Sequence, residues 1–145
     1  MIVHAGLLAL YGPKGWRGAL IEGPSGAGKS DLALRALDLG FRLVADDRTA
    51  LWTCAGRLYG AGPAPIAGLM EVRGLDVIAP GAVRRFASID LIVLCQPPEA
   101  PIERLPEPQS RPLLGVRTPV LQLRALEASA PAKLRWALSR LGATR

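Results

Sequence analysis

The sequence has 145 residues and half of them are hydrophobic, which is enough apolar material for one compact domain. No apolar run approaches the about 20 residues of a membrane-spanning helix, and the first residues do not resemble a signal peptide, so we expect a soluble, cytoplasmic protein with no membrane partner. The net charge of +6 favours acidic partners, but scattered basic residues and few aromatic residues argue against nucleic acid.

A β-hairpin is predicted at the start of the chain. Residues 4–11 and 16–22 are apolar runs of strand length. Residues 12–15 between them carry the glycine and proline typical of a turn. The second strand of this hairpin leads directly into a glycine-rich segment.

That segment fits the phosphate-binding loop pattern G-x-x-x-x-G-K-[ST] at every fixed position; it reads Gly23, Pro24, Ser25, Gly26, Ala27, Gly28, Lys29, Ser30. A helix is predicted from residue 30 or 31, and the free backbone N–H groups at its start would attract phosphate oxygens. We expect Lys29 to neutralise the charge of β- and γ-phosphates and the Ser30 hydroxyl to bind Mg²⁺.

The next strand is predicted to end in two adjacent acids. The helix should stop near residue 39 because Gly40 follows, and residues 41–45 should form a strand that ends on Asp46 and Asp47. Carboxylates close to Mg²⁺ can divide two tasks, holding the metal or its water and taking a proton from an attacking hydroxyl. Adjacent acids titrate as a coupled pair, so the sequence does not decide which of the two is the base.

The remaining chain is predicted to complete one α/β domain over residues 1–145. Its predicted parts are strands at 49–54 and 57–59, a mobile loop over the site at 74–85, a buried strand at 89–95, a proline-rich connector at 96–112, strand-like pieces around Thr118-Pro119 and a terminal helix at 131–141. Cys54 and Cys95 lack metal-ligand spacing, and Cys95 is expected in the core.

Four blocks of the sequence resemble the catalytic domain of the HPr kinase/phosphorylase family. They are Val3-His4-Ala5-Gly6-Leu7-Leu8, the loop 23–30, Arg42-Leu43-Val44-Ala45-Asp46-Asp47-Arg48 and Met70-Glu71-Val72-Arg73-Gly74-Leu75. The acid pair one strand after the loop, together with Glu71-x-Arg73-Gly74, makes the resemblance specific to this family.

The resemblance implies a phosphate-loop kinase of the phosphoenolpyruvate-carboxykinase-like fold with a mixed sheet. It implies a serine kinase that uses ATP and Mg²⁺ on the phosphocarrier protein HPr or an HPr-like protein and so regulates a phosphotransferase system. The reverse, phosphorylase reaction would use inorganic phosphate and release pyrophosphate. By position, Asp46 would be the base, His4 would tune the acid pair and Asp47 would support metal or water.

The resemblance also implies that Ser30 and Glu71 bind Mg²⁺ and that Arg73 and Arg84 meet phosphate charge on the mobile loop. The chain would be a short form without the family's N-terminal domain. The family's Pro-Val-x-Pro-Gly-Arg-Asn segment, which serves substrate docking and subunit contacts, is replaced by residues 121–127. The resemblance therefore leaves open the identity of the carrier, the phosphorylase reaction and the family's hexamer. Two alternatives remain open: a module that senses ATP or phosphate with little transfer, and a small-molecule kinase.

Overall fold

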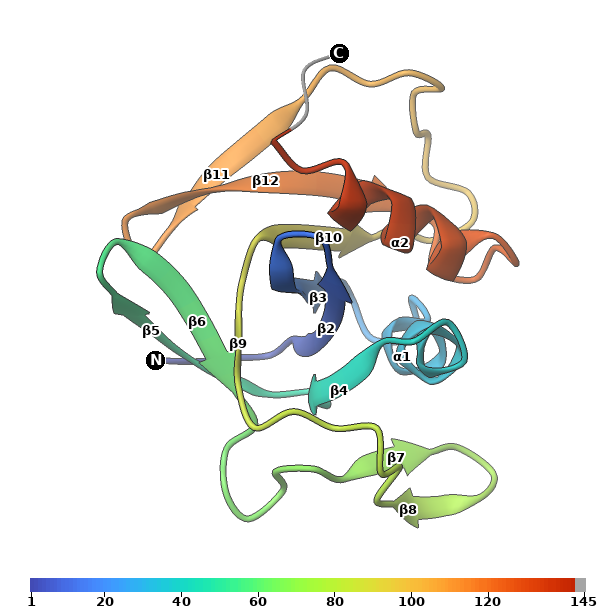
Figure 1. Cartoon of the computed structure of the whole chain (residues 1–145). Helices are drawn as coiled ribbons and strands as arrows, with labels where there is room; N and C mark the ends of the chain where they lie inside the picture. Colours follow the sequence, from blue (N-terminus) through green and yellow to red (C-terminus); the bar gives the residue numbers. More distant parts are fainter. Residues whose placement is uncertain (143–145) are drawn as a thin grey trace.

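A computed structural model describes residues 1–142 and has two helices and three β-sheets (Figure 1). The largest sheet has six strands in the order β11-β12-β10-β3-β2-β4. Its strands are β2 (Gly6–Gly12), β3 (Gly15–Glu22), β4 (Arg42–Ala45), β10 (Leu91–Cys95), β11 (Gln109–Leu113) and β12 (Val116–Leu123). β10 runs parallel to β3 and β12, and the other neighbours are antiparallel, so the predicted mixed sheet is confirmed.

The two faces of this sheet bury different residues because side chains alternate along each strand. One face packs against α1 (Lys29–Leu37) and α2 (Ala130–Ser139), and its cluster includes Leu8, Ile21 and Leu134. The opposite face, which includes Leu7 and Leu20, packs against a second sheet. That sheet contains β1 (Ile2–Val3), β5 (Thr49–Cys54), β6 (Arg57–Ala61) and β9 (Ala87–Ser88) in the order β1-β5-β6-β9.

The predicted hairpin forms, but its first strand is shorter than expected. Residues 2–3 pair with β5 in the second sheet, whereas β2 begins only at Gly6 in the six-stranded sheet. His4 and Ala5 therefore lie at the corner where the chain passes from one sheet to the other. The turn falls at Pro13 and Lys14, and Gly15 closes it with a φ of 87° that favours glycine.

α1 begins at Lys29, one residue before the earliest predicted start, and ends at Leu37, two residues before the predicted stop near residue 39. Leu32, Ala33 and Ala36 are buried on its inner face, and Gly40 adopts a φ of 90° after the helix. α2 also confirms the predicted terminal helix, with Pro131 in its first turn. Within residues 1–142, neither helix has the length and apolar character needed to cross a membrane.

The segment expected as a mobile loop is instead partly paired. Residues 70–78 form the hairpin of β7 (Met70–Val72) and β8 (Asp76–Ile78). Farther along, Leu43 donates its N–H to the Ala82 carbonyl at 2.8 Å and accepts from the Arg84 N–H at 2.9 Å. β4 is the edge strand of the six-stranded sheet, so residues 82–84 satisfy backbone groups that the sheet leaves free.

The last third of the chain largely follows the prediction. Residues 96–108 are not helical, as the prolines required, and residues 109–113 already belong to β11. The pieces expected around Thr118-Pro119 are one continuous strand, β12. Pro119 has no N–H to donate, and β12 tolerates it because the pairing with β10 begins only at Val120. Cys95 is buried at the end of β10, and this burial raises the pKa of its thiol to about 11.

Candidate active site

The phosphate loop leaves β3 at the carboxyl edge of the six-stranded sheet and ends at α1. Gly26 and Gly28 adopt φ values of 83° and 91°, which side-chain-bearing residues rarely take. Gly28 is the N-cap of α1, and no side chain forms a capping hydrogen bond there. No capping side chain therefore competes with an anion for the first N–H groups of α1. This arrangement has the geometry of the anion site that the sequence pattern predicts.

Lys29, in the first turn of α1, reaches across the base of the loop. Its Nζ donates to the carbonyl oxygens of Gly23 at 2.5 Å and Pro24 at 3.2 Å. The ammonium group is therefore held at the loop, where it can meet negative charge.

Asp46, at the end of β4, faces the start of α1. Its Oδ1 accepts a hydrogen bond from Ser30 Oγ at 3.4 Å, and its Oδ2 accepts one from the backbone N–H of Glu71 at 3.0 Å. Burial raises the pKa of Asp46 above its ordinary value, and the charges of Asp47 and Glu71 add to the rise, while the two hydrogen bonds oppose it. Asp46 thus becomes a better proton acceptor than an exposed aspartate.

Asp47, the second acid of the pair, contacts His4. The backbone of Asp47 has a φ of 66°, a left-handed conformation that aspartate tolerates better than most residues. His4 Nε2 lies 2.7 Å from Asp47 Oδ1, and both side chains are exposed. The histidine therefore contacts the second acid of the pair, so the two carboxylates have different partners.

Four of the predicted residues, Lys29, Ser30, Asp46 and Asp47, line one small hollow between β2, α1 and the end of β4. Oxygen donors from Ser30 and Asp46 suit Mg²⁺, which takes one or two carboxylates and completes its shell with phosphates and water. In the described residues 1–142, no group of three or more His, Cys, Asp or Glu side chains is arranged to hold a metal. A hydroxyl and a carboxylate oxygen beside a phosphate-binding loop are a donor set that fits Mg²⁺ bound together with a phosphate ligand.

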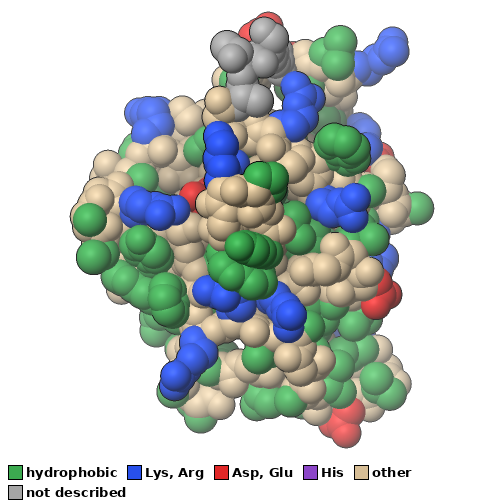
Figure 2. Space-filling view, viewed as in Figure 1, with side chains coloured by type: hydrophobic (Ala, Val, Ile, Leu, Met, Phe, Trp, Pro, Cys, Tyr) green, Lys and Arg blue, Asp and Glu red, His purple; other side chains and the backbone are tan. Residues whose placement is uncertain are grey.

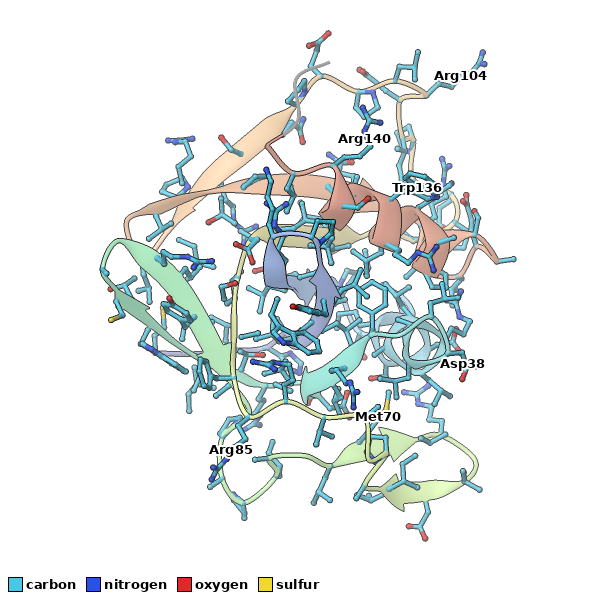
Figure 3. The ribbon with its side chains drawn as sticks, viewed as in Figure 1. Asp38, Met70, Arg85, Arg104, Trp136 and Arg140 are labelled. Atoms are coloured by element: carbon cyan, nitrogen blue, oxygen red, sulfur yellow. The ribbon has the colours of Figure 1, made fainter. Side chains whose placement is uncertain are left out.

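Arg73 and Arg84, the two arginines predicted to meet phosphate charge, lie in different parts of the structure. Arg73 lies exposed in the turn between β7 and β8, two residues from Glu71. The Arg84 guanidinium lies 4.1 Å from the centre of the Trp16 ring, at the end of β3 opposite the phosphate loop. The structure therefore brings Arg84 to Trp16, and Figure 3 shows Arg85 at a side of the molecule away from α1.

Basic side chains are not gathered in one stripe on the face that Figure 2 shows, where lysine and arginine lie in separate places. This distribution agrees with the scatter seen along the sequence.

Sequence reasoning missed several partners in and around the site. One is the backbone N–H of Glu71, which holds Asp46. Another is Glu22, directly before the loop, which receives two contacts from Arg111 Nη2 at 2.5 and 2.6 Å. Both partners depend on strand order, and the sequence pattern carried no signal for them.

Comparison with known proteins identifies the family. Residues 1–134 match the family described as the HPr serine kinase C-terminal domain. The chain belongs to this family. The resemblance seen in the four sequence blocks is thereby confirmed.

Individual relatives agree with this assignment. An HPr kinase/phosphorylase of Levilactobacillus brevis is 42% identical over 98 residues, which are 63% of this chain and 30% of that protein. One of Lactiplantibacillus plantarum is 37% identical over 131 residues, 83% of this chain and 40% of that protein. The chain thus spans less than half the length of these two relatives.

A solved structure extends the match to the whole fold. The structure of the Hpr(Ser) kinase/phosphatase from Coxiella burnetii matches with a TM-score of 0.80 at 25% identity, covering 95% of this chain and 93% of that one. The α/β fold of a kinase domain from this family is therefore confirmed.

Proposed function

We propose that this chain, as one catalytic domain, transfers the γ-phosphate of ATP to a serine of HPr or an HPr-like phosphocarrier protein in the cytoplasm. The observation that carries the proposal is the position of Asp46 beside Ser30 Oγ, at 3.4 Å, at the start of α1. A proton acceptor thus lies at the end of a phosphate-binding loop, where an attacking hydroxyl would meet a terminal phosphate.

Each residue of the site has a task in this reaction. The loop and Lys29 hold the phosphates, and Ser30 with Glu71 would hold Mg²⁺, which neutralises phosphate charge when it is bound. Asp46 takes the proton of the serine hydroxyl as the serine oxygen bonds to the γ-phosphorus and the bond to ADP breaks. Asp47, with His4, keeps a second carboxylate beside the site, and Arg73 lies in a turn that could approach the phosphates.

The reverse reaction would use the same groups. Inorganic phosphate attacks the phosphoserine phosphorus, the bond from phosphorus to the serine oxygen breaks as pyrophosphate forms, and Asp46, which starts protonated, gives its proton to that oxygen. Names of the relatives support both directions for the family, since two are called kinase/phosphorylase and one kinase/phosphatase.

The test is phosphorylation of an HPr-like protein that carries its regulatory serine, with ATP and Mg²⁺, followed by mass spectrometry of that serine. Asp46→Asn should lower the rate by roughly 10²–10⁴-fold, the usual contribution of a general base. Asp38→Asn is the matched control, because Asp38 is exposed at the far end of α1. Running Asp47→Asn alongside tests which acid is the base.

Each alternative has its own result. Tight ATP binding without transfer to any carrier would identify a sensing module. Turnover of a small alcohol while the carrier stays unmodified would identify a small-molecule kinase. Full activity of Asp46→Asn with loss of activity in Asp47→Asn would exchange the roles of the two acids.

A further inference from the structure

A second hollow lies beside the phosphate loop. It has a volume of about 310 Å³ and is lined by Gln96, Pro98, Arg124, Leu126 and Glu127. We call it the β10–β12 hollow, because these residues follow the carboxyl ends of those two strands. The loop, the acid pair and the histidine do not use it.

Strand direction places this hollow on the same edge of the sheet as the phosphate loop. β10 pairs in parallel with β3 on one side and with β12 on the other (Figure 1). The carboxyl ends of all three strands therefore open on one edge, where α/β sheets collect their ligands. The hollow and the phosphate loop are in direct contact at Leu126, because a Cβ added to Gly28 would lie 2.6 Å from Leu126 Cδ2.

The hollow and the acids lie on opposite sides of the loop. Asp46 follows β4, which is reached from β3 through β2, whereas the hollow is reached from β3 through β10. A triphosphate bound in the loop with its γ-phosphate toward Asp46 must direct its other end away from β4. That end carries the nucleoside.

Side chains of the hollow suit a base and a ribose. Pro98 and the half-exposed Leu126 offer apolar surface to a flat ring. The Gln96 side-chain amide, which hydrogen-bonds to no other residue of 1–142, can donate and accept at the ring edge. Glu127 can accept hydrogen bonds from ribose hydroxyls, and its carboxylate lies 2.9 Å from Lys133 Nζ and 3.5 Å from an Arg124 nitrogen.

The wall of the hollow is also fastened to the helix that carries the loop. Arg35 of α1 donates to the Glu127 carbonyl at 2.9 Å and to the Ala125 carbonyl. Arg124 in turn donates to the Ala100 carbonyl at 2.8 Å, in the segment that follows β10. These bonds join the segments after β10 and β12 to each other and to α1, so the hollow is formed before any ligand enters.

We propose that the β10–β12 hollow binds the base and ribose of the nucleoside triphosphate whose phosphates lie in the loop. This inference rests on the proposed function, since it assigns a place to the nucleoside of the same substrate.

Calorimetry with two ligands tests it: Mg²⁺–ATP, and Mg²⁺ with inorganic triphosphate, which has no nucleoside. The wild type should bind ATP more tightly than triphosphate. Leu126→Ala and Gln96→Ala, from two walls of the hollow, should each weaken ATP binding about tenfold and leave triphosphate binding unchanged. Leu105→Ala is the matched control, because Leu105 is 88% exposed in the connector before β11.

Every other outcome overturns the inference in a recognisable way. Unchanged ATP affinity in both variants would show that the nucleoside lies elsewhere. Equal losses for ATP and triphosphate would show that the hollow only shapes the phosphate loop. Equal affinity of the wild type for both ligands would refute the nucleoside site and leave the loop intact, whereas binding of neither ligand would refute the proposed function as well.

Discussion

Gly28 is the residue of the phosphate loop where a single added methyl group has the clearest consequence. Its φ of 91° is unfavourable for alanine, and the new Cβ would lie 2.6 Å from Leu126 Cδ2. A left-handed backbone costs a side-chain-bearing residue about 1–2 kcal/mol. Moving Leu126 out of its rotamer adds about 0.5–1.5 kcal/mol.

We therefore expect Gly28→Ala to lower the free energy of unfolding by roughly 1.5–3.5 kcal/mol, the sum of these two costs. Urea denaturation followed by circular dichroism measures it. Gly26→Ala is the matched control, because Gly26 has a φ of 83° and nothing within 4 Å of its added Cβ, so it carries the backbone cost alone.

A double variant separates the two contributions. In the Leu126→Ala background, Gly28→Ala should cost no more than Gly26→Ala does, since the steric part is gone. Equal costs of Gly28→Ala and Gly26→Ala in the wild-type background would refute the reasoning, as would a Gly28→Ala cost that Leu126→Ala leaves unchanged.

Two further predictions concern the charged groups of the site. Lys29→Ala should weaken ATP binding at least about tenfold, because a charge-assisted contact is lost. Lys14→Ala, in the exposed β2–β3 turn, is the control and should bind ATP like the wild type. Equal ATP affinities of Lys29→Ala and the wild type in calorimetry would show that the loop is not the phosphate site. Asp46→Asn should unfold at a higher urea concentration than the wild type at pH 7. Burial raises the pKa of Asp46 in the folded chain above its ordinary value of 3.8. The folded chain therefore loses stability as the pH rises from 3.8 through this raised pKa, and an uncharged asparagine avoids the loss. Below pH 3.8 the two proteins should converge, and a wild type that is the more stable at pH 7 would contradict the assignment.

Much of the architecture could be predicted from short stretches of sequence. Alternating and continuous apolar runs located the β2–β3 hairpin, β4, β5, β6 and β10, because each pattern reflects burial of that strand. Gly40 and Pro131 marked helix ends through backbone preferences that belong to single residues. The predictions that needed correction concern residues 4–5, which pass from one sheet to another, and residues 74–85, which pair in part with β7 and in part with the edge strand β4.

The candidate site shows the same division between local and distant determinants. The eight residues of the phosphate loop and the pair Asp46-Asp47 were evident from the sequence alone, since a phosphate site of this kind uses the backbone of one turn and the start of one helix. Family membership also followed from short blocks, and the match over residues 1–134 confirms it.

Tertiary structure alone decided how those residues are used. It gave Asp46 the Ser30 hydroxyl and Asp47 the His4 ring, and it placed Arg84 over Trp16. It also set the β10–β12 hollow beside Gly28. These contacts join residues 16 to almost 100 positions apart, so they depend on strand order and direction, which no single stretch of the chain encodes.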